Sequence, residues 1–266
     1  MAGSGDEHKM LFDIRGKRRN VVKVVYAILA LLMGLSLFLL AGGGGIASIF
    51  NSGNESGSGA TIAIEQAERI ERKLKKSPGD ADLLAALTRT RLTAGTGSFE
   101  QTVQGPVPTT EAVDQYQQAS NSWSEYLKAT KEPSAGTAAL MAPALVTLAE
   151  NSNINEFGPN MKAAAEAQAI VAEQRPSVNS LSTEAIYRYF TFDYPAAEKV
   201  EKEAIALAKT KAQREEVEKG LEPYAKRAKE VQKNIKGIEA ASKSGGGGKE
   251  AIENPFGGLG GGTLSE

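Results

Sequence analysis

The sequence predicts an all-α protein in which one transmembrane helix precedes a domain of short antiparallel helices. An uncharged apolar run begins at Val24, and beyond residue 60 apolar residues recur three and four apart, which is the period of an amphipathic helix. No segment alternates with period two for long enough to predict a strand. These observations favour a helical domain carried on a membrane anchor.

The apolar run is long enough to cross a bilayer. Residues 24–50 carry no charge, and the eighteen residues 24–41 would reach roughly 27 Å as a helix, close to the thickness of the hydrocarbon core. We therefore expect residues 21–50 to form a transmembrane anchor. A cleaved signal peptide is the alternative, with Gly45-Ile46-Ala47 as its best cleavage site, although its apolar segment is usually shorter.

The charges that flank the run predict its orientation. Six Lys and Arg lie between residues 9 and 23, whereas the first cation after the run is Arg69. The positive-inside rule then makes residues 1–20 a cytoplasmic tail and places the residues after 50 outside the cytoplasmic membrane. Ala30 and Gly34 have the spacing that lets membrane helices approach closely, which would permit weak self-association, but glycine is common in such helices.

The amino-acid composition excludes several kinds of catalytic and metal-binding site. The chain has no cysteine, which excludes thiol catalysis, thiolate zinc sites and iron–sulfur clusters. Its single histidine, His8, lies in the basic tail, so the helical domain has no imidazole for a catalytic triad. The net charge is −1, and because the tail is basic the remainder is weakly acidic, which argues against nucleic-acid binding.

Gly-rich segments bound the helical domain on both sides. Residues 51–60, "NSGNESGSGA", are typical of a flexible linker. Residues 241–266 contain too much glycine and too little apolar surface to fold, so we expect a disordered tail. The helical domain is therefore predicted over residues 61–240.

Eight helices are expected within this domain. The first has an apolar stripe from Ala63 to Leu74; the second starts at a capping box formed by Ser77 and Asp80 and ends at Gly95. The third, from about residue 111, contributes Trp123 to the core. The others are expected from Pro133 with a kink at Pro143, over 159–174, 181–192 and 195–209, and over 212–240 with interruptions at Gly220 and Pro223.

Prolines at positions 78, 133 and 176 separate these helices into pairs. The stretches "PGDADLLAALTRTRLTAG" and "LSTEAIYRYFTFDYPAAEKVEKEAIAL" resemble the tetratricopeptide-repeat (TPR) family. The family has large residues where this chain has Leu84 and Leu87, and a turn residue where it has Gly95. Its small positions match Ala185, Ala197 and Ala204, and its aromatic position matches Tyr194. Thr88, Pro143 and a one-residue slip before Pro176 depart from the pattern.

The resemblance implies a degenerate TPR-like solenoid of antiparallel helix pairs over about residues 81–209. The alternative is a compact helical bundle, which would have no concave groove. In the solenoid, the inward positions would be Asp82, Arg89, Asn179, Ser182 and Tyr189, a set able to bind a peptide. The plainer interpretation leaves Arg89 solvated and Tyr189 packed.

No segment predicts catalysis, a cofactor or a metal site. "SGGGGKE" lacks both the leading glycine and the final Ser or Thr of a phosphate-binding loop. The paired glutamates of the last helices alternate with lysines, which is typical of a solvated helix face. We therefore expect a membrane-anchored, extracytoplasmic scaffold that binds a protein or peptide. Its layout is similar to bacterial membrane-anchored TPR proteins that assist protein export. A secreted binding protein, a hydrolase and a mechanical tether are the rivals.

Overall fold

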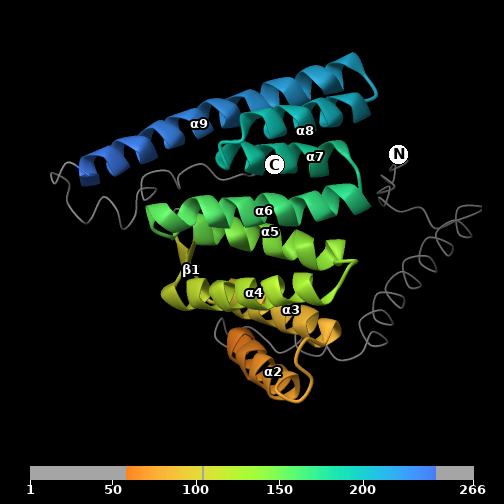
Figure 1. Ribbon diagram of the computed structural model, residues 1–266, viewed down its shortest axis with the longest axis vertical. Coiled ribbons are helices and arrows are strands. Elements are labelled where there is room, and N and C mark those ends of the chain that lie inside the picture. The colour runs from red at the N-terminus through yellow and green to blue at the C-terminus, as the bar shows by residue number, and fades with distance from the viewer. Residues whose placement is uncertain (1–57, 104, 244–266) are drawn as a thin grey trace, which may run out of the picture. The chain divides into compact units, whose positions relative to one another are not determined.

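The computed structural model describes residues 58–103 and 105–243, all within one compact unit, Glu55–Glu266 (Figure 1). The predicted basic tail, the membrane anchor and most of the predicted linker and Gly-rich tail lie outside the described residues. Among the residues that are described, no helix is both long and apolar enough to cross a membrane. The anchor and its orientation therefore stay predictions.

The described residues fold into eight helices and one small hairpin, so the all-α prediction is confirmed. The helices are α2 (Ser58–Leu74), α3 (Ala81–Gly97), α4 (Thr110–Ala129), α5 (Ala135–Glu150), α6 (Ile154–Gln174), α7 (Val178–Phe190), α8 (Tyr194–Leu207) and α9 (Lys211–Lys243). The strands are β1 (Phe99–Thr102) and β2 (Gly105–Pro108).

Short polar side chains fix where most of the helices begin. The side chains of Asp80, Thr109, Ser134 and Asp193 each accept a hydrogen bond from a backbone N–H in the first turn of the helix that follows. Such caps satisfy donors that a helix leaves unpaired at its start. The predicted capping box at Ser77 was wrong, because Asp80 itself caps α3; a capping box is formed instead at Ser177.

The helices stack in antiparallel pairs (Figure 1). Packing within α3–α4, α5–α6 and α7–α8 is more extensive than packing between one pair and the next. α2 lies against α3 at one end of the stack, and α9 lies against α7 and α8 at the other. Pro78, Pro133 and Pro176 fall in the connections that precede the three pairs, as the sequence predicts.

The largest part of the core runs through α3 to α6. Leu84, Met141 and Leu145 are its largest fully buried hydrophobic side chains. Trp123 is buried beside Tyr126, with their ring centroids 5.4 Å apart, so its predicted place in the core is confirmed. A second cluster joins α7, α8 and α9 around Leu181, which extends the buried surface along the stack.

Besides the end of α3, three features of the fold differ clearly from the prediction. α6 begins at Ile154, because the Asn153 side chain accepts hydrogen bonds from two backbone N–H groups and caps the helix ahead of Pro159. α9 continues through Gly220 and Pro223, both of which are exposed, so water can satisfy the carbonyl that the proline leaves unpaired. The third difference is the hairpin, where no strand was expected.

Gly95 was predicted to end α3, but the helix continues to Gly97. Gly95 instead allows α3 to approach α4 closely. It is buried, and a methyl group in its place would lie 2.4 Å from two carbons of the Tyr116 ring. That separation is well inside van der Waals contact, so any side chain at this position must displace the ring or the helix. Gly95 therefore sets the spacing within the first helix pair.

We expect Gly95→Ala to lower the free energy of unfolding by about 1–3 kcal/mol, because the added methyl group overpacks the contact with Tyr116. Gly220→Ala is the matched control, because a methyl group there meets nothing within 4 Å. The control should raise stability by up to about 1 kcal/mol, since alanine is the better helix former. Urea unfolding monitored by circular dichroism measures both; equal stabilities would contradict this role for Gly95.

Candidate functional site

The structure does not bring the five predicted peptide-binding residues together. Asp82 and Arg89 are exposed on α3, whereas Asn179 is exposed and Ser182 half-buried on α7. The α5–α6 pair lies between these two helices in the stack (Figure 1). Any ligand that contacts both groups must therefore cross α5 or α6.

Tyr189, the fifth predicted residue, is packed rather than presented to solvent. It is only 4% exposed, its ring lies 6.3 Å from that of Tyr194, and its hydroxyl donates a hydrogen bond to the Glu201 carboxylate. Burial, followed by the hydrogen bond to Glu201, raises the pKa of the Tyr189 hydroxyl well above its usual value. Tyr189 therefore joins α7 to α8 and offers little surface to a ligand.

Arg89 lies beside α5. Its Nη1 atom is 3.5 Å from the hydroxyl of Thr137, which is buried on α5, while the arginine itself stays exposed. The guanidinium group therefore sits at the border of the solvent-facing side of α5. None of the predicted site residues comes from α5.

The solvent-facing side of α5 is uncharged and largely apolar. Gly136, Ala139, Leu140 and Pro143 are exposed and Thr147 is half-buried; we call these five residues the α5 face. They recur three and four apart, so they share one side of the helix. Leu140 is 54% exposed, and α5 has no charged residue before Glu150.

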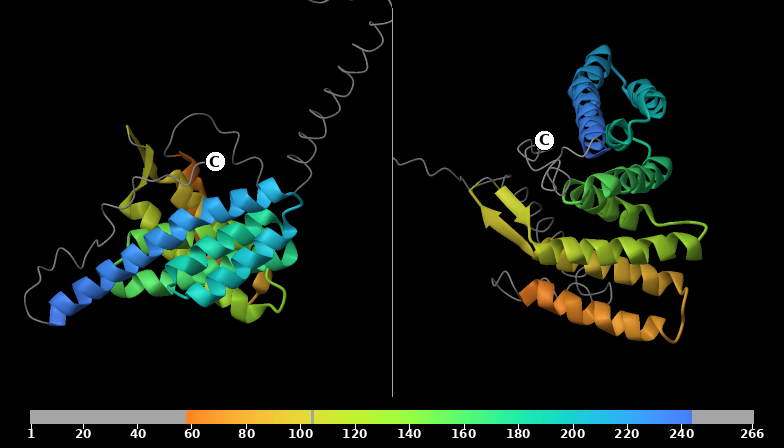
Figure 2. Two further views of the ribbon diagram at one scale, coloured as in Figure 1. Left: turned by 90° about the horizontal axis from the view of Figure 1, so that it is seen from above. Right: turned by 60° about the vertical axis from the view of Figure 1, so that its left-hand side comes forward.

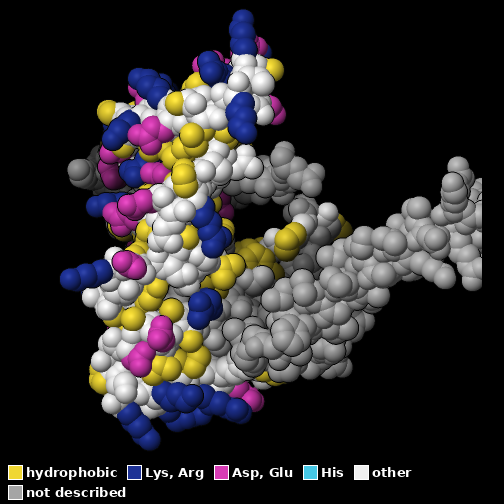
Figure 3. All heavy atoms as spheres, turned by 90° about the vertical axis from the view of Figure 1, so that its right-hand side faces the viewer, with side chains coloured by type: hydrophobic (Ala, Val, Ile, Leu, Met, Phe, Trp, Pro, Cys, Tyr) yellow, Lys and Arg dark blue, Asp and Glu magenta, His cyan; other side chains and the backbone are white. Residues whose placement is uncertain are grey.

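An uncharged face is unusual for a helix in contact with water. Surface helices normally carry charged or polar residues opposite their apolar stripe, and a helix that is apolar all round is normally buried. The neighbouring α6 follows the usual pattern, with Glu156, Lys162 and Glu166 exposed. On the side of the domain drawn in Figure 3, hydrophobic side chains reach the surface between scattered charged ones.

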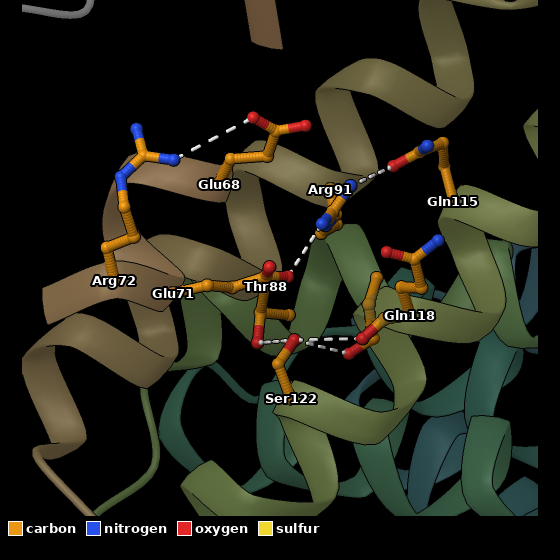
Figure 4. Close-up of polar contacts among 9 residues, drawn as sticks. Glu68, Glu71, Arg72, Thr88, Arg91, Gln115, Gln118 and Ser122 are labelled. Atoms are coloured by element: carbon orange, nitrogen blue, oxygen red, sulfur yellow. Dashed lines mark hydrogen bonds and ion pairs between the residues drawn. The ribbon is translucent and has the colours of Figure 1, made fainter. Parts of the chain in front are cut away.

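A polar cluster on the other side of α3 from Arg89 was not predicted from the sequence. Arg91 is 5% exposed; its Nη1 donates to Gln115 Oε1 at 2.9 Å and its Nη2 to Glu71 Oε1 at 2.6 Å (Figure 4). Its Nε atom has no hydrogen-bond partner among the described residues. The three side chains come from α2, α3 and α4, so the cluster joins the first helix to the first pair.

A second set of hydrogen bonds lies beneath Arg91. The hydroxyl of Thr88 lies 3.0 Å from that of Ser122 (Figure 4). It also lies 2.9 Å from the carbonyl oxygen of Leu84. Ser122 also contacts the carbonyl oxygen of Ala119 at 3.0 Å. Both hydroxyls are buried and satisfied, so we assign this cluster a structural role in holding α2, α3 and α4 together.

Residues that could hold a metal ion do not gather in the part of the chain that the structure describes. Among residues 58–103 and 105–243, no three His, Cys, Asp or Glu side chains lie close enough together to form a site. The α5 face with Arg89 at its border is therefore the best candidate site in the described domain.

We expect Glu71→Gln to loosen α2, because Arg91 would keep its buried charge and lose its counter-charge. Replacing the carboxylate partner of a buried charge by a neutral amide weakens a charge-assisted hydrogen bond and should cost about 1–3 kcal/mol, which corresponds to roughly fivefold to hundredfold faster amide exchange in α2. Glu68→Gln is the matched control, because among the described residues Glu68 forms its ion pair with the exposed Arg72, at 3.9 Å. Hydrogen exchange measured by mass spectrometry would contradict the assignment if both variants exchanged alike.

Comparison with known protein families, with curated proteins and with solved structures finds no match to this chain.

Proposed function

We propose that this chain is a membrane-anchored, extracytoplasmic interaction scaffold that binds a peptide segment of another protein on the α5 face. The observation that carries the proposal is the solvent-facing side of α5, which has no charged residue between Ala135 and Ala149. It is a proposal for binding without catalysis.

The physical reason is the cost of leaving this face in water. Contiguous exposed apolar surface on a folded domain often marks an interaction site, whereas single exposed apolar residues are common and carry no such meaning. Leu140 and Pro143 lie one turn apart at the centre of the face, with Ala139 beside them. Covering these side chains gains about 25 cal/mol for each Å² of apolar surface removed from water.

The neighbouring charges indicate the chemistry of the segment. Arg89 is an exposed cation at the border of the face, close to Thr137. A peptide with apolar side chains for Leu140 and Pro143, and an acidic group for Arg89, would satisfy both features. Because Arg89 is exposed, its ion pair with the peptide would add little affinity and more specificity.

The stacking order matches a solenoid of helix pairs only in part. α3 contacts both its partner α4 and α5, the first helix of the next pair, whereas the second and third pairs meet mainly through α6 and α7. In a regular solenoid successive first helices contact each other, and each pair buries its apolar surface against its neighbours. In such a solenoid, α5 would be the middle first helix.

The predicted membrane anchor would make weak peptide binding sufficient for function. A domain tethered to a membrane meets other membrane-bound components at a raised effective concentration, so modest affinity for a peptide can suffice. Residues 24–50 supply the predicted tether. Assistance to protein export or envelope assembly is the process that the layout favours.

A peptide selection tests the proposal. We would display random peptides on phage, select them against the full-length protein in lipid nanodiscs and measure affinities of the enriched peptides. Those peptides should contain apolar side chains, and Leu140→Glu should weaken their binding at least tenfold, because a carboxylate on an apolar contact must be desolvated without a partner.

Leu207→Glu is the matched control. Leu207 is a similarly exposed leucine, at 44%, but ends α8, so the same substitution there should leave affinity unchanged. Selection of no peptide, or equal binding by the wild-type protein and Leu140→Glu, would reject the α5 face as the binding surface.

A further inference from the structure

The β1–β2 hairpin projects from the helices (right-hand view of Figure 2). Its base is fixed: the Phe99 ring lies 6.0 Å from that of Tyr116, and the Thr109 hydroxyl donates to the Ser98 carbonyl oxygen at 2.6 Å. Beyond this base the strands are exposed, and Val103 at the tip is fully exposed. The hairpin is therefore held firmly at its base, and little of the described helical domain packs against its outer part.

The register of the hairpin determines which backbone groups face outward. Glu100 pairs with Val107, and Gln101 with Pro106, in an antiparallel arrangement. Residues of an antiparallel pair alternate between exchanging hydrogen bonds with the partner strand and pointing away from it. Because proline has no N–H, Pro106 and Pro108 must occupy outward-pointing positions, and so must their partners Gln101 and Phe99.

The two edges of the hairpin are consequently unlike. On β2, both outward-pointing residues are prolines, so this edge offers no N–H donor to a further strand. On β1, Phe99 and Gln101 direct both N–H and C=O away from β2, which is the pattern that an added strand needs. Two-stranded hairpins are only marginally stable in water, so a third strand would stabilise this one.

We propose that β1 pairs antiparallel with β1 of a second copy of this chain, about a two-fold axis through Gln101. The result is a four-stranded sheet in the order β2–β1–β1–β2. A two-fold interface presents the same surface from both copies, as the single open edge of this hairpin does.

Charge and strand overlap favour this register over its two neighbours. With the axis at Gln101, Glu100 lies opposite Thr102 of the second copy, and Phe99 lies opposite Val103. With the axis at Glu100, the two Glu100 carboxylates would oppose each other, which is destabilising. With the axis at Thr102, only one residue of each four-residue strand would face a strand residue of the other copy.

The prolines also limit the size of the assembly. In the four-stranded sheet both outer strands are β2, whose edges lack outward donors, so a third copy cannot extend it. The pairing therefore ends at a dimer. Four residues on each side form a much smaller interface than the ~800 Å² per partner of a stable complex, so we expect association mainly where copies are concentrated.

Single cysteines test the register cleanly, since the chain contains none of its own. Gln101→Cys places two thiols directly across the axis, where Cα atoms of a hydrogen-bonded pair lie about 5.5 Å apart, within the disulfide range. We would express the full-length variant in membranes, oxidise it mildly and resolve it on a non-reducing gel. A disulfide-linked dimer is expected, and Val107→Cys on β2 should give none.

A mixed experiment tests the same register independently of Gln101. Glu100→Cys in a tagged copy and Thr102→Cys in an untagged copy should link to each other more efficiently than either links to itself. Circular dichroism confirms that each variant is folded. Three results would overturn the proposal. They are equal linkage of Gln101→Cys and Val107→Cys, a dimer in which neither experiment forms the expected disulfide, and the absence of a dimer at any membrane density.

Discussion

Close packing between helices through small residues is the constraint on which this domain depends. Ala112, Ala119, Ala138 and Ala164 have no exposed surface, and Gly95 brings α3 onto the Tyr116 ring of α4. Contacts of this kind contribute little apolar area each, so no single pair could stay folded on that basis alone. Stability must accumulate along the stack. This explains why α2 needs the ion pair between the buried Arg91 and the partly exposed Glu71, and why Tyr189 joins α7 to α8.

Local patterns in the sequence predicted the helices and largely failed for features that depend on tertiary contact. Apolar spacing and the positions of prolines located all eight helices of the described domain, because both act within a few residues. The hairpin was missed because its strands are short and β2 contains two prolines. Arg91 was missed because its partners come from two other helices, although its place four residues after Leu87 and one before Leu92 indicated the buried side of α3.

The candidate site shows the same division. Arg89 was selected by its position in the resemblance and does lie at the border of the α5 face, whereas Tyr189 turned inward. Leu140 was not selected, because exposure of an apolar residue on an apolar helix cannot be read from its neighbours in sequence. The α5 face and the β1 edge are chemically distinct: one presents apolar side chains, and the other presents backbone donors and acceptors. A peptide and a second copy could therefore be bound by the same molecule at different places.

The measurement that tests the central claim most directly is hydrogen exchange on the full-length protein in nanodiscs, with and without a phage-selected peptide at saturating concentration. Peptide binding should slow exchange in α5, and to a smaller extent around Arg89 of α3, while exchange in α2 and α9 stays unchanged. Slower exchange confined to α8 and α9, or unchanged exchange in α5 with the peptide demonstrably bound, would contradict the assignment of the α5 face as the binding surface.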